Sequence, residues 1–268
     1  QKLKKIIEKY KIDSIIHLAA NLIIGEGQRK PNKYYKNNVL GTKKLLDACK
    51  DTTIKNFIFS STAAIYKEGQ YKVSENSIIK PKSIYGQTKI KAEKIIKSFA
   101  KKNKINYGIL RYFNIAGASL SGKIGLINKK SDHLFKNFSI EIMKKNPKLK
   151  IYGTDYKTKD GSCIRDFIHV SDIAEIHYLI LEKIDKLNIS KILNCGYNKG
   201  TSVIEVAKEF KKQSSKKVEI IFAKRRNNDL IKIIASNNKL KNFINWKPKF
   251  NNLRKIVKSC IIWEKKLN

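Results

Sequence analysis

The stretch KNFIFSST, residues 55–62, lies at the centre of the pattern that decides the fold. Its apolar run is short and continuous, which is typical of a parallel strand buried on both faces of a sheet. The run DSIIHLAA, residues 13–20, has the same character, and INYGILRYFN, residues 105–114, follows as a third strand. These three segments predict a buried parallel sheet.

Helical patterns separate the three strands. Apolar residues recur with a helical period over residues 3–10, Pro31 is well placed to begin a helix that runs to residue 50, and another helix spans residues 83–102. This alternation predicts an α/β fold with a doubly wound, Rossmann-like parallel sheet. We place residues 1–114 in this domain. Residues 115–268 are expected to form mainly a smaller C-terminal α/β lobe, with some segments returning to the sheet.

The second half contains further expected elements. Its loops are richer in glycine and serine, and Thr201 or Ser202 is the expected N-cap of one helix. The expected helices cover residues 133–145, 202–212 and 252–266, and the expected strands cover 148–153, 191–196 and 218–226, with a strand followed by a helix over 161–184.

The chain carries a formal net charge of +36. Only six of its 58 basic residues are arginine, and the lysines are spread along the whole sequence. A nucleic-acid-binding module more often concentrates arginine and aromatic residues on one element. We therefore interpret the charge as a solvated lysine surface that attracts anionic ligands, and we expect no specific nucleic-acid partner.

Membrane and metal classes are disfavoured by the sequence. No run of about 18 or more apolar residues is present, so no membrane-spanning helix is expected. The first residues form a lysine-rich amphipathic pattern, unlike a signal peptide. The four cysteines are scattered without CxxC spacing. They are interpreted as reduced thiols of a cytoplasmic protein, which disfavours both a disulfide framework and a metal site.

Tyr85 and Lys89 form a candidate catalytic pair. They lie four residues apart on the helix expected over 83–102, and therefore on the same helix face. A lysine ammonium near a phenol favours the phenolate and lowers its pKa, which suits the phenol to move the proton of a sugar hydroxyl. Thr62, at the end of the preceding strand, is placed to hydrogen-bond the same hydroxyl. The alternative is a surface tyrosine packed on a lysine stem, because lysine is abundant in this chain.

Seven segments occur together in a meaningful order: IIHLAA, YYKNNVLGT, KNFIFSSTAAIY, IYGQTKIKAE, ILRYFNIAGA, DGSCIRDFIHVSDIA and AKRRNNDL. From about residue 5 to the C-terminus they resemble the extended short-chain dehydrogenase/reductase family and, within it, the UDP-glucose (UDP-hexose) 4-epimerases. The Y-x-x-x-K pair is shared by the whole superfamily. RYFNIAGA and DGSCIRDFIHV are much more specific to the epimerases.

The resemblance implies roles for individual residues. Tyr85 is the acid/base, Lys89 tunes it and binds the nicotinamide ribose, and Thr62 completes the triad. Besides these three, the implied NAD site contains Leu18, Ala19, Ala20, Asn21, Leu22, Asn37 and Phe113. The implied UDP-hexose site contains Thr62, Asn114, His133, Leu134, Lys150, Ile151, Tyr152, Arg165, Arg226, Asp229 and Ile233.

The implied reaction is the NAD-dependent interconversion of UDP-glucose and UDP-galactose. The C4 hydroxyl is oxidised, the 4-keto sugar rotates, and reduction from the other face inverts C4. An aliphatic residue at position 233 leaves open whether N-acetylated UDP-hexoses are also substrates. The resemblance further implies a homodimer formed through the helices of residues 31–50 and 83–102.

The sequence departs from the family pattern in one important respect. It contains neither G-x-x-G-x-x-G nor G-x-G-x-x-G, the turn that holds the pyrophosphate after the first strand of this fold. We therefore expect an N-terminally incomplete epimerase that lacks the first strands and the glycine-rich turn. Such a polypeptide alone is expected to bind NAD poorly and to be unstable or inactive. Leu22 also stands where many members carry a lysine near the pyrophosphate.

Two alternatives remain at this stage. One is another nucleotide-sugar enzyme of the same superfamily, a dehydratase, a decarboxylase or a reductase. A 4,6-dehydratase places an acidic pair after the threonine, whereas here Ala63 and Ala64 follow Thr62, which disfavours elimination chemistry. A decarboxylase or reductase is less cleanly excluded. The other alternative is a non-catalytic basic binding protein, which the charge alone suggests.

Overall fold

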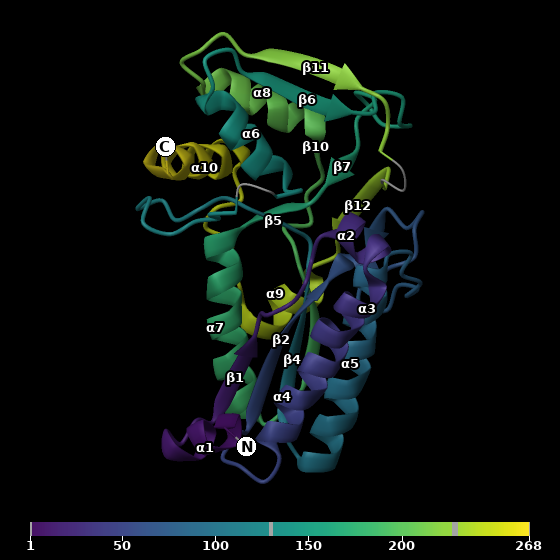
Figure 1. Ribbon diagram of the computed structural model, residues 1–268, viewed down its shortest axis with the longest axis vertical. Helices are drawn as coiled ribbons and strands as arrows, with labels where there is room; N and C mark the ends of the chain where they lie inside the picture. Colours follow the sequence, from purple (N-terminus) through teal and green to yellow (C-terminus); the bar gives the residue numbers. More distant parts are fainter. Residues whose placement is uncertain (1, 129–130, 227–229, 268) are drawn as a thin grey trace.

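A four-stranded parallel sheet forms the lower half of the molecule (Figure 1). The computed structural model describes residues 2–128, 131–226 and 230–267. The strand order is β1-β2-β4-β9, and every neighbouring pair is parallel. The α/β prediction with a parallel sheet is thereby confirmed. The strands are β1 (Ser14–His17), β2 (Asn56–Thr62), β4 (Asn106–Tyr112) and β9 (Lys191–Cys195).

Helices cover both faces of this sheet. In Figure 1, α4 and α5 lie on one side of the strands and α7 on the other. The helix expected from Pro31 is present, although it contains a π-helical segment, η1. The elements are α1 (Lys2–Lys9), α2 (Ile24–Arg29), α3 (Pro31–Tyr34), η1 (Tyr35–Leu40), α4 (Gly41–Cys49), α5 (Ile84–Asn103) and α7 (Val170–Leu187).

The helix α5 carries the two candidate catalytic residues, and its ends follow from its sequence. Ser83 caps the N-terminus, where its hydroxyl accepts a hydrogen bond from the backbone N–H of Gly86 at 3.1 Å. Lys104 ends the helix in the left-handed conformation, with φ of 53°. The face toward the sheet is buried and includes two charged residues, Lys89 and Glu93.

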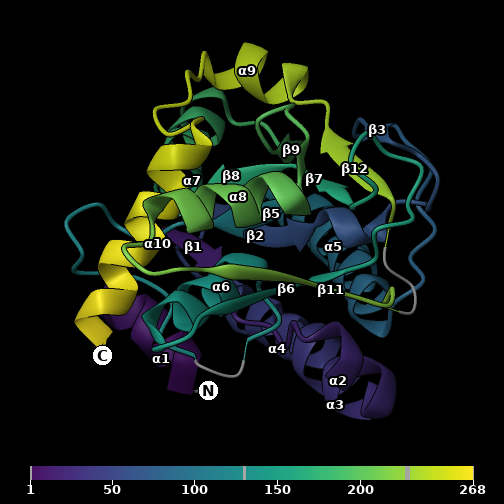
Figure 2. The ribbon, with the colours of Figure 1, turned by 90° about the horizontal axis from the view of Figure 1, so that it is seen from above.

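A second group of elements, which we name the upper lobe, lies at the other end of the long axis. Strands β6 and β11 pair in parallel, and Figure 2 shows them from above beside α8 and α10. Ser202 and Glu205 form a capping box at the start of α8, which confirms Ser202 as the N-cap. The upper lobe comprises α6 (Leu134–Met143), β6 (Lys148–Tyr152), α8 (Val203–Gln213), β11 (Glu219–Ala223) and α10 (Leu253–Leu267).

Short strands connect the two halves. One small sheet has the order β10-β7-β12-β3, and another pairs β5 with β8. One hydrophobic cluster contains Ile58 and Leu110 of the parallel sheet together with Phe135 and Leu149 of the upper lobe. The domain boundary after residue 114 stays a prediction. The connecting elements are η2 (Ala63–Ile65), β3 (Lys72–Val73), β5 (Asn114–Ala116), β7 (Ile164–Arg165), β8 (Phe167–His169), β10 (Thr201–Ser202), β12 (Lys232–Ala235) and α9 (Asn238–Ile244).

Two sequence expectations were wrong in detail. The segment 21–30, expected as a loop, contains α2, because this helix packs on the buried ring of Tyr34, whose hydroxyl also donates to the carbonyl oxygen of Ile23 at 2.6 Å. The strand expected over 105–114 is divided. Beyond Tyr112 the backbone N–H of Asn114 donates to the carbonyl oxygen of Asp166, so the chain changes its partner strand.

None of the helices within residues 2–128, 131–226 and 230–267 is both long enough and apolar enough to cross a lipid bilayer.

Candidate active site

The carboxyl ends of β1, β2 and β4 lie side by side and define the candidate site. Thr62, the last residue of β2, is opposite Tyr112, the last residue of β4, and His17 ends β1 beside Phe59. The N-terminal turn of α5 places Tyr85 at the same edge, where it hydrogen-bonds Thr62. Ligands of open α/β sheets bind at this edge, so the fold itself points to this location.

Tyr85 and Thr62 are the candidate proton-transfer residues of the site. Burial raises the pKa of Tyr85, and its hydrogen bond with Thr62 opposes that shift. The sequence argument expected the neighbouring lysine to lower this pKa, and this expectation was wrong. The physical reason is desolvation, which disfavours the charged forms of both side chains.

Lys89, which follows Tyr85 by one helical turn on α5, is almost completely buried. The residue is 2% exposed, and its Nζ lies 4.2 Å from the centroid of the Phe59 ring. Burial lowers the pKa of Lys89 to about 7, and the charge of Glu93 opposes the shift. Among the residues that the structure describes, none accepts a hydrogen bond from Nζ. The N–H donors of Lys89 are therefore available to hydroxyl groups of a ligand.

His17 is an additional titratable residue of the site that the sequence analysis missed. Its Nε2 lies 3.0 Å from the hydroxyl of Thr42 on α4. Burial, and after it the charge of Lys89, lowers the pKa of His17 to about 4. The imidazole is therefore neutral at pH 7 and does not add a second positive charge beside Lys89.

The loop after β1 is held by Asn38, whereas the sequence analysis selected its neighbour Asn37. The backbone N–H of Asn21 donates to Asn38 Oδ1 at 2.8 Å, and Asn38 Nδ2 donates to the carbonyl oxygen of Asn21 at 2.9 Å. Asn38 Nδ2 also donates to Thr88 of α5 at 3.1 Å. Asn37 itself is exposed. In this loop Leu18, Ala19 and Leu22 are exposed, and Ala20 and Asn21 are half-buried.

Four of the other predicted residues lie where the parallel sheet meets the connecting strands. Phe113 and Ile233 are buried in one hydrophobic cluster, and Asn114 is exposed. The pairing of β12 with β7 places Ile233 opposite Arg165, which is half-buried. The side chain of Arg165 also donates to the carbonyl oxygen of Ile164 at 2.9 Å.

The upper lobe contributes a second group, at the ends of β6 and β11. The guanidinium of Arg226 lies 4.2 Å from the centroid of the Tyr152 ring, and Lys150 Nζ lies 5.3 Å from the same centroid. Both cations are exposed. Ile151 has its side chain in the core, so it presents no side chain to a ligand. Arg225, which the sequence analysis did not select, forms an ion pair with Asp155 at 2.5 Å.

The remaining predictions are less informative. His133 is the exposed N-cap residue of α6, and Leu134, the first residue of that helix, is half-buried. Asp229 lies outside the described residues. No group of three or more histidine, cysteine, aspartate or glutamate residues is arranged to hold a metal ion in the part of the chain that the structure describes.

A parallel sheet with a Tyr–Lys pair and a threonine at its carboxyl edge defines a protein of the short-chain dehydrogenase type. A family model described as the NAD dependent epimerase/dehydratase family matches residues 1–196. A UDP-glucose 4-epimerase of Azospirillum brasilense is 35% identical over 266 residues, which cover 99% of this chain and 76% of that protein. The chain belongs to the NAD-dependent epimerase/dehydratase family.

Solved structures agree with this assignment. A UDP-glucose-4-epimerase from Stenotrophomonas maltophila, solved with bound NAD and formylated UDP-arabinopyranose, gives a TM-score of 0.94 at 28% identity. The match covers 99% of this chain and 80% of that chain. The UDP-Glc/GlcNAc 4-epimerase of Campylobacter jejuni is 40% identical, with a TM-score of 0.84 and coverage of 99% and 81%.

Proposed function

We propose that this protein interconverts UDP-glucose and UDP-galactose through oxidation at C4, rotation of the 4-keto sugar and reduction from the other face. The observation that carries the proposal is the group formed by Tyr85, Thr62 and Lys89 at the carboxyl edge of the sheet. The family assignment and the two epimerase structures support it.

Tyr85 acts as the general acid/base for the C4 hydroxyl. Its phenolate removes the hydroxyl proton, and the phenol returns a proton in the second half of the reaction. The Thr62 hydroxyl hydrogen-bonds Tyr85 and holds it toward the sugar. A charged Lys89 ammonium favours the phenolate, so the protonation state of Lys89 determines what fraction of Tyr85 is present as the phenolate base.

The residues at the site fit NAD on the nicotinamide side. The buried Nζ of Lys89 has N–H donors without a protein acceptor among the described residues, which suits the hydroxyls of a ribose. Asn38 holds the backbone of Asn21 in the loop of residues 18–22, and the buried Phe113 is proposed to contribute apolar surface to the site. NAD, when bound, supplies the acceptor and donor of the C4 hydride.

The upper lobe is proposed to bind the UDP part of the substrate. Arg226 is permanently charged and its planar fork suits a diphosphate, while its stacking on Tyr152 restricts its orientation. Arg165 and Ile233, which lie opposite each other in the pairing of β7 with β12, are proposed to contribute to the sugar site. N-acetylated UDP-hexoses are included as further substrates to be assayed, because one relative of known structure is a UDP-Glc/GlcNAc 4-epimerase.

The site does not favour a dehydratase. Elimination needs an acidic pair just after the threonine, whereas Ala63 and Ala64 occupy these positions, and the backbone N–H of Ala64 donates to Thr62 Oγ1 at 3.2 Å. Alanine side chains have no proton to give.

The test is a C4-inversion assay with UDP-galactose and saturating NAD, followed by proton NMR of the product. We expect UDP-glucose to form, and UDP-N-acetylgalactosamine is assayed in parallel to define the range of substrates. Formation of a 4-keto-6-deoxy product, or no turnover of either UDP-sugar by polypeptide shown to be folded and saturated with NAD, would overturn the proposal.

The NAD site is expected to be weak in this 268-residue polypeptide. No glycine-rich fingerprint occurs in the sequence, so these residues supply no such cradle for the pyrophosphate. We expect NAD to be lost during gel filtration and turnover without added NAD to be absent, whereas excess NAD offsets weak binding by mass action. Purified polypeptide that keeps NAD and epimerises without addition would contradict this.

A homodimer formed through the helices of residues 31–50 and 83–102 is part of the proposal. The exposed apolar side chains Tyr35 and Leu40 lie on η1, which packs beside α5. Light scattering coupled to gel filtration is expected to give twice the mass of the chain, and substitution of both residues by serine is expected to give the monomer mass. A monomer in the unsubstituted protein would refute it.

A further inference from the structure

The inference concerns a buried charged network beneath the candidate catalytic pair. Glu93 follows Lys89 by four residues on α5 and is fully buried. Three bonds hold its carboxylate. Ser61 donates to Oε1 at 2.5 Å, Arg111 Nε donates to Oε1 at 3.1 Å, and Arg111 Nη2 donates to Oε2 at 2.8 Å. The carboxylate is therefore fixed in position.

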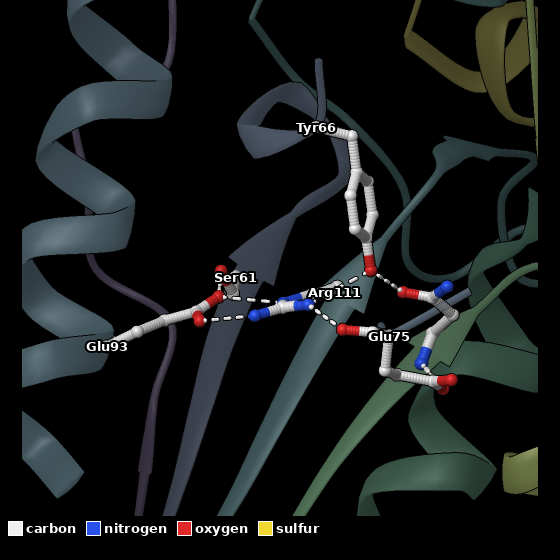
Figure 3. A network of polar contacts seen from close by, with 6 residues as sticks. Ser61, Tyr66, Glu75, Glu93 and Arg111 are labelled. Carbon is white, nitrogen blue, oxygen red and sulfur yellow. Dashed lines mark hydrogen bonds and ion pairs between the residues drawn. The ribbon is translucent and has the colours of Figure 1, made fainter. Parts of the chain in front are cut away.

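Arg111 is itself anchored on its far side. Figure 3 shows Glu93 reaching from α5 to Arg111, and Arg111 continuing toward Tyr66 and Glu75. Arg111 Nη1 donates to the hydroxyl of Tyr66 at 3.1 Å and to the carbonyl oxygen of Glu75 at 3.3 Å. The hydroxyl of Tyr66 in turn donates to Asn194 Oδ1 at 2.6 Å. The network links α5 with β2, β4 and β9.

The position of the network relates it to the chemistry. Ser61 directly precedes Thr62 in β2, and Arg111 lies opposite Ser61 in the β2–β4 register. Tyr85, Lys89 and Glu93 are spaced by four residues and share one face of α5. Glu93 is the acidic group that opposes the effect of burial on Lys89. A structural anchor could have been placed anywhere along α5, but this one lies one turn from the catalytic lysine.

We propose that Glu93 is a positioning residue of the reaction, whose carboxylate, fixed by Ser61 and Arg111, keeps Lys89 charged beneath Tyr85. This inference rests on the acid/base role proposed for Tyr85 and Lys89. Lys89 also faces the neutral His17 from β1 and the Phe59 ring from β2, and neither supplies a negative charge. Glu93 also lies near the phenol of Tyr107 on β4.

Two single substitutions test the proposal, because they act on Lys89 in opposite directions. Glu93→Gln removes the negative charge and leaves Arg111, so Lys89 loses its proton more easily and the phenolate of Tyr85 is less favoured. Arg111→Met leaves the negative charge uncompensated, so Lys89 stays charged to higher pH and the phenolate is more favoured. Both variants are expected to be less stable, because each leaves one buried charge without its partner. If Glu93 had a purely structural role, both variants would lose stability and neither would shift the ionisation of Tyr85 in a direction opposite to the other.

The measurement is an ultraviolet difference titration of the Tyr85 phenolate in the NAD-free protein, against Tyr85→Phe in each background. We expect the titration midpoint to move up by about one pH unit in Glu93→Gln, a tenfold change in the ionisation equilibrium, and down in Arg111→Met. The acidic limb of the pH profile of kcat is expected to move in the same directions, with KM for UDP-galactose nearly unchanged. Equal midpoints in the three proteins, or shifts in one direction only, would overturn the proposal.

A matched control and a second variant complete the design. Lys136 and Glu264 form another buried ion pair, with Nζ and Oε2 2.7 Å apart, between α6 and α10. Glu264→Gln is expected to lower stability without moving the Tyr85 midpoint. If a single variant does not fold, Glu93→Gln combined with Arg111→Met removes the pair together. It is expected to raise the midpoint by less than Glu93→Gln alone, and an unchanged midpoint contradicts the proposal. The titration needs no turnover, so it decides this inference even if the proposed epimerase activity fails.

Discussion

The parallel sheet and the upper lobe place the charged residues of the proposed site in different environments. At the sheet, Lys89 is 2% exposed and is followed one turn later by a fully buried Glu93 paired with Arg111. At the end of β6 and β11, Arg226 and Lys150 are exposed and lie over the ring of Tyr152. The first group has its geometry set by packing, and the second remains in water.

The difference matches the two tasks that we propose. A proton-transfer group needs a tuned pKa, and burial is what shifts the pKa of Lys89 to about 7. A group that binds a diphosphate needs a permanent charge and access to the ligand, and an exposed arginine provides both. We therefore expect loss of a single atom at the sheet to lower kcat strongly. Substitutions in the upper lobe are expected to raise KM by smaller steps.

Replacement of Tyr85 by phenylalanine is expected to reduce activity more than the other substitutions in the two regions. The hydroxyl that carries the proton is removed, so kcat should fall by about 10² to 10⁴-fold, the range of general acid–base contributions. Steady-state kinetics with UDP-galactose and saturating NAD measure the loss, and calorimetric binding of UDP to the same variant serves as the control. A variant that keeps a tenth or more of the activity would assign the acid/base role elsewhere.

Arg226→Ala is expected to act on binding alone. Loss of one charged hydrogen-bonding group costs about 1.5–3 kcal/mol, so KM for UDP-galactose should rise by about 10 to 100-fold with kcat nearly unchanged. Because Arg226 is exposed, the free energy of unfolding measured in urea should stay within about 0.5 kcal/mol of that of the original protein. A fall in kcat with unchanged KM would place Arg226 in the chemistry and remove the distinction between the two regions.

The pH dependence of stability tests the buried region at His17. The pKa of His17 falls from 6.5 to about 4 on folding, so its stabilising contribution is complete above pH 6.5 and is lost as the pH falls toward 4. The contribution is about 2 kcal/mol after allowance for partial exposure. Between pH 7 and pH 4.5 the free energy of unfolding in urea should fall more steeply in the original protein than in His17→Gln. Parallel curves would show that His17 is solvated.

Tyr152→Leu is expected to give the smallest effect. An exposed cation–π contact contributes about 0.5–1 kcal/mol, so loss of the ring beneath Arg226 should raise KM by about two to five-fold. The control is Tyr10→Leu just after the end of α1, where the centroid of an exposed tyrosine ring lies 5.3 Å from the Nζ of Lys9. This control should leave KM unchanged, and an equal rise in both variants would exclude a specific role for the Arg226 stack.

The sequence predicted the alternation of strands and helices well, because that signal is local. The apolar run of β2, the serine before α5 and the capping box of α8 each depend on residues a few positions apart. The helix α2 was missed because it packs on Tyr34. The strand β12 was missed because its four residues pair with β3 and β7, which are distant in the sequence.

The candidate site shows the same division. Tyr85, Lys89 and Thr62 could be selected from spacing and from resemblance, and the hydrogen bond of Thr62 with Tyr85 joins two of them. Asn38, His17 and the Glu93–Arg111 pair carried no comparable signal. These residues are held by hydrogen bonds between partners that are 17 to 25 positions apart in the sequence. The bonds join Asn38 to Asn21, His17 to Thr42 and Glu93 to Arg111.

The sequence by itself therefore determined the fold class and the family, and it selected the candidate acid/base residues, because periodicity, caps and motifs are properties of neighbouring residues. Only the tertiary structure decided the charge environment of those residues. Desolvation and the pairing of Lys89, Glu93 and Arg111 depend on how α5 packs against the sheet, and this packing sets the direction of each pKa shift at the site.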